Sequence, residues 1–251
     1  MKKSSYIVCS LLLLAGCNLL PPPTVSLEVH PQVEVNGFHS VFLDAAGQVW
    51  TWGDNRFGQL GDGTTINHAT PNAITGLPMI AAVAAGGSHT LALTTDGQVW
   101  AWGQNSDNIL GVSTVTTTQV SPVLIPNLDH VTAIADGDGH GAALRSDGKV
   151  WTWGINTDGQ TGLTQETNHP FPEPVPNMDD VTAIAAGDNH TLILREDRTV
   201  WATGFNDYGQ LGDGTTQSRS EFAEVNNLSN IKAIAAGESF SLALDAYGDV
   251  W

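Results

Sequence analysis

The stretch Asp96-Gly97-Gln98-Val99-Trp100-Ala101-Trp102-Gly103 returns along this chain with a nearly constant period. Its leading tryptophan recurs at steps of 50 or 51 residues, and every tryptophan of the chain follows this period. The eight are Trp50, Trp52, Trp100, Trp102, Trp151, Trp153, Trp201 and Trp251. A fixed period of this length indicates one supersecondary unit that has been copied several times.

Each copy carries further residues at fixed distances from its tryptophans. A glycine-containing turn and a histidine precede them, and the histidines are His39, His89, His140 and His190, with Phe240 in the fifth copy. An Asp-Gly pair stands between two short apolar runs, as at Asp147-Gly148. An asparagine such as Asn55 follows the tryptophans, and then comes Gly-Gln-Leu-Gly at residues 58–61.

The apolar residues of each unit alternate with a period of two, which is typical of strands and not of helices. The Asp-Gly pairs predict two-residue hairpins with a type I′ turn. The two tryptophans of a pair stand at i and i+2 and therefore point to the same face of a sheet, where we expect them to fill the packing between blades. Each unit is predicted to be an antiparallel sheet of about four short strands. Radial stacking of such sheets produces a β-propeller.

These motifs resemble the repeats of the regulator of chromosome condensation repeat family over residues 33–251. The resemblance implies a seven-bladed β-propeller in which the repeated histidines are structural. This chain has five first half-units, near Gly37, Gly86, Gly137, Gly187 and Gly237, but four clear second half-units. We therefore expect an all-β propeller of four-stranded blades of about 50 residues, with four to five of seven blades present.

Two interpretations of the blade count stay open. In the first, the sequence is a fragment, incomplete at the C-terminus, because Trp251 falls inside a predicted core strand. In the second, the segment Val25–Val35 acts as a second half-unit that completes the last blade and closes a ring of five. Pro21, Leu27 and Val33 each lie fifty residues before a matching residue, which supports this alternative.

The first 24 residues differ from the repeats. Lys2 and Lys3 precede a short apolar run that ends in Leu14-Ala15-Gly16-Cys17, and this has the anatomy of a signal peptide. The ending resembles a bacterial lipobox, which implies that Cys17 is the lipidated first residue of the mature protein; an ordinary secretory signal is the alternative. We expect a lipoprotein signal peptide over 1–17, a proline-rich tether over 18–24 and a propeller over 25–251. The protein would be exported and lipid-anchored to the cell membrane or the outer membrane.

Charge narrows the class of partner. The chain has a net charge of −17, and without Lys2 and Lys3 only seven basic residues remain against 26 acidic ones. Nucleic-acid binding needs clustered basic residues, so we do not expect it. An acidic surface favours cationic partners. The expected partners are an unknown protein or surface ligand, with the membrane reached through the lipid.

No residue pattern predicts a metal, a cofactor or an active site. The four histidines share one slot and could form a ring, but Phe240 interrupts it, so a structural role is favoured. The run Asp136-Gly137-Asp138-Gly139 resembles the start of a calcium loop but lacks the further oxygen ligands. No nucleophile or general base stands out, so we do not expect an enzyme. Phe57 and Tyr208 are candidate partner contacts, with local packing as the alternative.

The favoured function is therefore a lipid-anchored, extracytoplasmic propeller that binds or scaffolds a protein or ligand, since loops on a rigid disc suit binding. An envelope enzyme that uses the propeller channel is one alternative. Guanine-nucleotide exchange, which the family resemblance implies, is another; export would separate the chain from cytosolic GTPases. The partner and the propeller face that binds it are not identified by the sequence.

Overall fold

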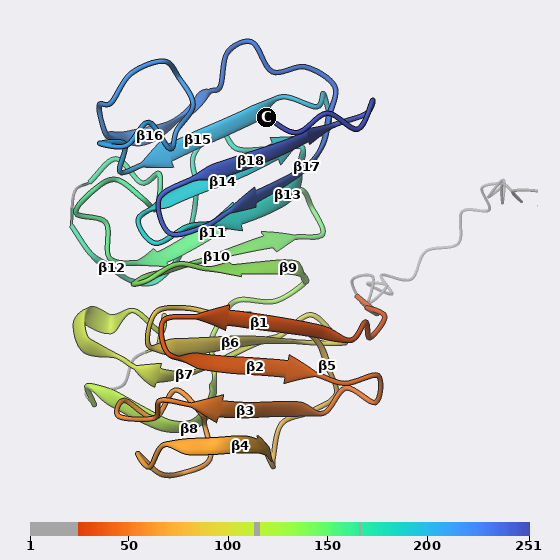
Figure 1. The fold of residues 1–251 in the computed structure, drawn as a ribbon, viewed down its shortest axis with the longest axis vertical. Coiled ribbons are helices and arrows are strands. Elements are labelled where there is room, and N and C mark those ends of the chain that lie inside the picture. The colour runs from red at the N-terminus through yellow and green to blue at the C-terminus, as the bar shows by residue number, and fades with distance from the viewer. Residues whose placement is uncertain (1–24, 113–115, 166) are drawn as a thin grey trace, which may run out of the picture.

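The computed structural model describes residues 25–112, 116–165 and 167–251. These ranges form four antiparallel sheets of four strands and one of two strands (Figure 1). The predictions of an all-β fold and of a four-stranded unit are confirmed. The predicted signal peptide and tether, with Cys17, lie outside the described residues.

We number the sheets as blades 1 to 5 in chain order, so that β1–β4 form blade 1 and β17–β18 form blade 5. The strands are β1 (Gln32–Asn36), β2 (His39–Leu43), β3 (Val49–Gly53), β4 (His68–Ala73), β5 (Ile80–Ala85), β6 (His89–Thr94), β7 (Val99–Gln104), β8 (Thr118–Leu124), β9 (Val131–Asp136), β10 (His140–Arg145), β11 (Val150–Gly154), β12 (His169–Pro174), β13 (Val181–Ala186), β14 (His190–Arg195), β15 (Val200–Gly204), β16 (Arg219–Glu224), β17 (Ile231–Ala236) and β18 (Ser241–Asp245). One 3-10 turn, η1 (Ser106–Asn108), follows β7.

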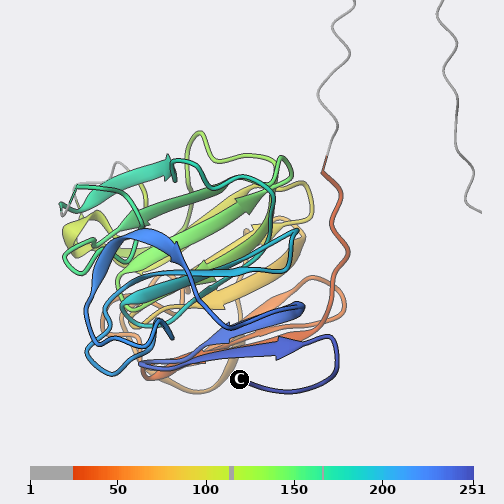
Figure 2. The same ribbon diagram turned by 90° about the horizontal axis from the view of Figure 1, so that it is seen from above.

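The first strand of each blade lies innermost and contacts the first strand of the next, from β1 through β5, β9 and β13 to β17. The sheets therefore stack around a common axis (Figure 2). Because neighbouring strands are antiparallel, their connections alternate between two faces. Face A carries the turns between first and second strands and the long loops between third and fourth strands. Face B carries the turns between second and third strands and the connections between blades (Figure 1).

The alternative in which Val25–Val35 completes the last blade is wrong. The structure pairs β1 with β2 antiparallel, with Gln32 opposite Leu43 and Asn36 opposite His39. A tight turn at Gly37, with φ of +54°, joins the two strands. Residues 32–36 are thus the inner strand of blade 1, where a local hairpin forms more readily than a pairing with the far end of the chain.

The Asp-Gly turns differ from the predicted type I′ hairpin. In blade 2 the amide of Thr94 donates to the carbonyl of Gln98, so three residues form the loop. Gly97 has φ of +83°, whereas Asp96 keeps a negative φ. A three-residue loop of this kind needs one left-handed residue, which is why glycine recurs there. Blade 4 has Arg198 in that position, and it adopts φ of +66°.

The second tryptophans of blades 2 and 3 pack between blades, as predicted for the pairs. Trp102 and Trp153 are fully buried in apolar clusters shared by neighbouring blades. A Cβ added to Gly61 of blade 1 would lie 2.7 Å from the indole nitrogen of Trp102. Gly111 meets Trp153 in the same way at the next boundary, at 3.0 Å. The last glycine of the Gly-Gln-Leu-Gly motif, and the glycine at the same position of blade 2, therefore leave room for the indole of the next blade.

At the boundary between blades 3 and 4, different residues fill the space that an indole fills elsewhere. Thr203 replaces the second tryptophan, and the ring of Phe222, from the adjacent β16, lies against Gly162 of blade 3. Phe222 is 7% exposed and joins the apolar cluster at this boundary. The Thr203 hydroxyl donates to the carbonyl of Gly159 at 2.9 Å. The phenyl ring thus takes the volume that an indole fills elsewhere.

Replacing Arg198 with glycine is expected to stabilise the protein by about 1 kcal/mol, because a left-handed conformation is strained for any residue with a Cβ. Chemical denaturation of the two proteins measures the difference. Gly148→Ala, at the same turn position of blade 3, is the matched control and should destabilise by a similar amount. A neutral or destabilising Arg198→Gly would contradict this account of the turn.

Phe222→Ala is expected to destabilise the protein by about 3 kcal/mol, because it leaves a cavity where two blades meet. Phe171→Ala, in the neighbouring blade, removes the same atoms from a side chain that is 44% exposed and should cost much less. Equal losses in a denaturation experiment would show that Phe222 does not substitute for the missing indole.

Candidate functional site

Three of the four repeated histidines make one contact that joins neighbouring blades. His39 Nε2 of blade 1 lies 3.0 Å from Thr90 Oγ1 of blade 2. That hydroxyl donates to the carbonyl of Gln59, back in blade 1, at 2.9 Å. The equivalent chains are His140–Thr191–Gln160 and His190–Ser241–Gln210. We call this chain of imidazole, hydroxyl and carbonyl the interblade staple.

The staple sets the protonation of its imidazoles. A hydroxyl has one proton, and the proton of Thr90 goes to a carbonyl, so the hydroxyl must accept from His39 Nε2–H. Burial lowers the pKa of His39 to about 4 and that of His190 to about 4. Burial, together with neighbouring histidines, lowers the pKa of His140 to about 3. All three are therefore neutral at pH 7.

The boundary between blades 2 and 3 uses a different pair. Gly141 stands where the staple needs a hydroxyl, and any Cβ there would collide with the indole of Trp153. His89 instead contacts Asp136 at the end of β9, with 2.7 Å between Nε2 and Oδ1. Burial raises the pKa of Asp136, and the neighbouring His89 opposes that effect. The predicted calcium-like run beginning at Asp136 is thus a turn between β9 and β10.

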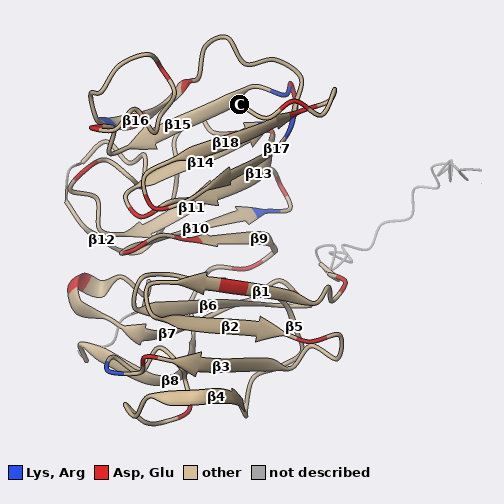
Figure 3. Cartoon of the chain, viewed as in Figure 1, with Lys and Arg blue, Asp and Glu red and all other residues tan. Residues whose placement is uncertain are grey.

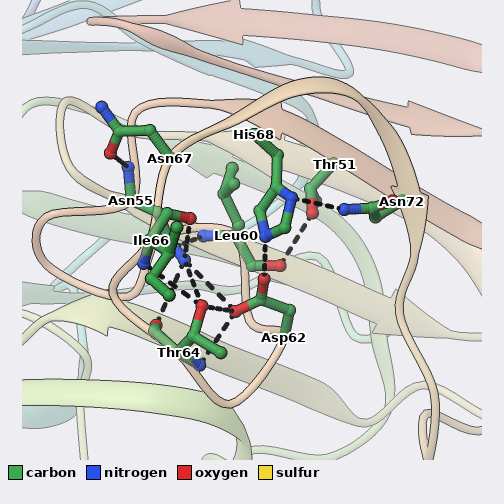
Figure 4. Close-up of polar contacts among 9 residues, drawn as sticks. All are labelled: Thr51, Asn55, Leu60, Asp62, Thr64, Ile66, Asn67, His68 and Asn72. Atoms are coloured by element: carbon green, nitrogen blue, oxygen red, sulfur yellow. Dashed lines mark hydrogen bonds and ion pairs between the residues drawn. The ribbon is translucent and has the colours of Figure 1, made fainter.

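The long loops of face A are organised by the repeated asparagine. In blade 1 the side-chain amide of Asn55 donates to the carbonyls of Thr64 and Ile66, both at 3.1 Å, and its oxygen accepts from the amide of Leu60 (Figure 4). Asn206 makes the same contacts in blade 4. The repeated asparagine therefore holds the conformation of the loop that contains Gln59, whose carbonyl is part of the interblade staple.

One acid–histidine pair within these loops resembles a general-base dyad. His68 Nε2 lies 2.7 Å from Asp62 Oδ2, and Asn72 contacts its other ring nitrogen (Figure 4). In blade 4 the same slot holds Arg219, which pairs with Asp213. A guanidinium is never a base at neutral pH. The shared role of the two pairs is to hold the loop against the fourth strand.

The inner turns of face A surround a cavity of about 580 Å³ at the axis. Asp138, Asp188 and Glu238 come from blades 3, 4 and 5 and occupy one slot of the repeat, directly after the glycine of the inner turn. Glu34 of β1 and the buried Asp136 also line the cavity, as does one basic residue, Arg56. In Figure 3 the positions of acidic residues are coloured red along the ribbon. We call this region the acidic mouth.

Backbone contacts hold the acidic mouth in place. The amide of Asp138 donates to the carbonyl of Asp188 at 3.0 Å, and that of Asp188 donates to Glu238 at 3.2 Å. The three side chains are thereby kept near one another. Burial raises the pKa of Asp188, and the neighbouring Asp138 and Glu238 raise it further. Burial also raises the pKa of Glu34. A positive charge placed in the mouth would relieve this repulsion.

The acidic mouth does not have the arrangement of a metal centre. Within residues 25–112, 116–165 and 167–251, no three His, Cys, Asp or Glu side chains converge as metal ligands. No helix in the same ranges is long and apolar enough to cross a membrane. The carboxylates that line the mouth attract positive charge, and an ammonium or guanidinium group needs no fixed coordination geometry to meet them.

The two aromatic residues predicted as partner contacts lie in face A loops of different blades. Phe57 of blade 1 is 37% exposed and Tyr208 of blade 4 is 76% exposed. Tyr208 packs edge-on against Phe205, with ring centroids 6.1 Å apart. Phe38, in the inner turn of blade 1, is 78% exposed and was not among the candidates. These aromatic residues border the same face as the acidic mouth.

Most of the acidic mouth is not predicted by the sequence. Asp136 and Asp138 stand out there only as an incomplete calcium loop, and Asp188, Glu238 and Glu34 do not stand out at all. A signal was present, because three consecutive copies place an acid directly after the glycine of the inner turn. The four repeated histidines make contacts across blade boundaries. Five repeated tryptophans belong to or pack against the interblade clusters, and they are Trp100, Trp102, Trp151, Trp153 and Trp201. Trp50 and Trp52 are half-buried in blade 1, and Trp251 is 61% exposed at the end of the chain.

Comparison with known proteins agrees with this architecture. A family model described as RCC1-like domain matches residues 17–251. Among curated proteins, the chain is 34% identical over 150 residues to the human probable E3 ubiquitin-protein ligase HERC6, covering 57% of this chain and 14% of that protein. It is 31% identical over 139 residues to the ultraviolet-B receptor UVR8 of Arabidopsis thaliana, covering 54% of this chain and 31% of the receptor. The chain thus spans a minor part of these relatives.

Solved structures show the same fold. The chain superimposes on Prp20p of Saccharomyces cerevisiae, from a study of its binding to Gsp1p and histones, with a TM-score of 0.76 and 27% identity. The match covers 87% of this chain and 56% of that one. Human WBSCR16 has a TM-score of 0.78 at 23% identity, with 87% and 58% covered. This second likeness concerns the fold alone.

The neutral staple histidines predict a loss of stability in acid. Their folded pKa values lie below the ordinary 6.5, so the unfolded chain binds more protons as the pH falls from 6.5 toward 4. For His140→Gln, which keeps a donor but cannot titrate, this part of the loss should disappear. The difference is on the order of a few kcal/mol.

Urea denaturation at intervals between pH 7 and pH 4 measures the effect. His30→Gln is the control, because His30 is exposed and its loss should leave the acid profile unchanged. Parallel profiles for wild type and His140→Gln would show that this imidazole is not held neutral.

Proposed function

Because the chain belongs to the RCC1-like domain family, we propose that it is a protein-binding module exported to a bacterial envelope and anchored through a lipid on Cys17. It binds a partner through face A, and a basic side chain of the partner enters the acidic mouth. The observation that carries the proposal is the cluster of Asp138, Asp188 and Glu238 around one cavity. Yeast RCC1 (Prp20) has been crystallised bound to Kap60, and Prp20p has been studied for its binding to Gsp1p and histones, which supports protein binding by analogy.

Face A supplies the other elements of a protein interface. Exposed aromatic residues are enriched where proteins bind each other, and Phe38 and Tyr208 are both largely exposed. The two basic residues of this face, Arg56 and Arg219, are paired with Asp54 and Asp213. Their charges are thus offset locally, and the mouth keeps its negative potential. Such a potential speeds the encounter with a basic partner and selects against acidic ones.

Neutralising the mouth should weaken binding of a basic partner. We expect Asp138→Asn, Asp188→Asn and Glu238→Gln together to reduce the affinity for a lysine- and arginine-rich peptide by about tenfold or more, because charge pairs are lost at similar shape. Fluorescence anisotropy at low and moderate salt measures the change. The same three-charge reduction on face B, through Asp96→Asn, Asp147→Asn and Asp197→Asn, is the matched control.

Equal loss in the two triple variants would reduce the effect to net charge and would contradict a site at the mouth. An unchanged affinity in the face A variant would contradict it as well. The peptide that binds best then serves as a competitor when the full-length protein is used to isolate partners from envelope extracts.

The anchor has its own test. Cys17→Ser removes the sulfur that the lipid requires, so the variant should move from the membrane fraction to the soluble extracytoplasmic fraction, with the fold unchanged. Two acyl chains give stable anchoring, so the expected loss is nearly complete. Membrane association that survives the change would contradict the anchor and leave the protein-binding proposal standing on face A alone.

A further inference from the structure

Residues before the first strand attach to the body of the propeller on face B. The amide of Leu27 donates to the carbonyl of Thr95, in the turn between β6 and β7, at 2.8 Å. Val25 lies beside Gly97 of the same turn: a Cβ built on Gly97 would lie 3.2 Å from the Cβ of Val25. We call residues 25–31 the strap.

The strap is tied to two blade boundaries and not only to its own blade. Leu27 packs against the apolar cluster that joins blades 2 and 3, and Val29 packs against the cluster that joins blades 1 and 2. Where β1 begins, the side-chain amide of Gln32 donates to the backbone carbonyl of Val83 of blade 2 at 2.7 Å. The point at which the chain reaches the body is therefore fixed relative to the strands.

Covalent geometry limits how far face B can lie from a lipid on Cys17. Eight Cα–Cα steps separate Cys17 from Val25, so this segment spans at most about 28 Å whatever its conformation. A strand of six residues is about 20 Å long, and the loops of face A extend beyond it. To place face A on the bilayer, the segment would have to run the full height of a blade and its loops.

The distribution of basic residues favours the same orientation. Five of the seven that follow the signal peptide lie at the face B ends of blades 3 to 5, and they are Arg145, Lys149, Arg195, Arg198 and Lys232 (Figure 3). Face A combines the acidic mouth with two basic residues, Arg56 and Arg219. Pairing with aspartates occurs on both faces, since Arg145 and Lys149 of face B lie beside Asp129 and Asp179, so the faces differ in the number of basic residues, five against two. Within about 10 Å of anionic headgroups, face A would be repelled more strongly than face B.

We propose that face B is the membrane-facing surface of the anchored protein, and that the strap holds the acidic mouth open away from the bilayer. This rests on the proposed lipid at Cys17. It implies that the partner approaches from the side away from the anchoring membrane, as a soluble protein or one presented by another surface.

Two matched labelling sites in blade 4 test the orientation. The chain has two cysteines, of which Cys9 would leave with the signal peptide and Cys17 would carry the lipid, so a thiol added to the lipidated protein is labelled alone. Glu196→Cys places a donor fluorophore in the face B turn, and Thr216→Cys places it in the face A loop; both positions are exposed. The purified lipoprotein is reconstituted into phosphatidylcholine and phosphatidylglycerol vesicles that carry an acceptor dye on a headgroup.

We expect energy transfer from position 196 to exceed transfer from position 216 by about two-fold or more, because about 20 Å of strand separates the faces. Equal transfer, or more from position 216, overturns the proposed orientation. Co-flotation of the lipidated protein with vesicles is scored in the same samples, with the Cys17→Ser form as reference. Failure to float overturns the anchor itself, so the two outcomes are distinguished.

Discussion

The interblade staple is the contact on which the rest of this structure depends. A single carbonyl, that of Gln59, accepts from the Thr90 hydroxyl at 2.9 Å and from the Trp102 indole at 2.9 Å, both of the next blade. Asn55 shapes the loop that presents this carbonyl, and His39 completes the chain above it. At the boundary between blades 1 and 2, these contacts therefore connect the inner turn before His39, the loop that contains Gln59 and the apolar cluster around Trp102. Buried polar groups are costly unless each finds its partner, so these residues work as a unit.

The two irregular boundaries show how narrow this constraint is. Where Trp153 takes the space beside Gly141, no hydroxyl fits, and a buried carboxylate at Asp136 serves His89 instead. Where Thr203 leaves the indole position empty, Phe222 fills it from the neighbouring strand. In both cases the volume between blades is conserved while the residues that fill it change. Close packing of protein interiors explains this, since a void or an overlap of even one methyl group is destabilising.

The same stacking creates the acidic mouth as a by-product of repetition. Residues that share a repeat slot fall on a circle around the axis, so Asp138, Asp188 and Glu238 come together although fifty residues separate them along the chain. Burial raises the pKa of Asp188, and repulsion from Asp138 and Glu238 raises it further, which is a cost that packing alone does not require. Carboxylates held together in this way are typical of sites that receive a charge from a partner. The strap lies on the opposite face, and the proposed anchor would therefore turn the mouth away from the membrane.

Much of the fold could be predicted from the spacing of tryptophan, histidine, glycine and asparagine, because a repeat must present the same residues to each neighbour. The strand period, the four-stranded unit and the interblade position of Trp102 and Trp153 all followed from it. The hairpin type did not, since loop length depends on register. The strap could not be placed, because its contacts with Thr95 and Gly97 join residues far apart in the chain. The acidic mouth could not be predicted either. A single acidic residue after a glycine indicates no site by itself, and only the stacking of the blades brings its copies around one cavity.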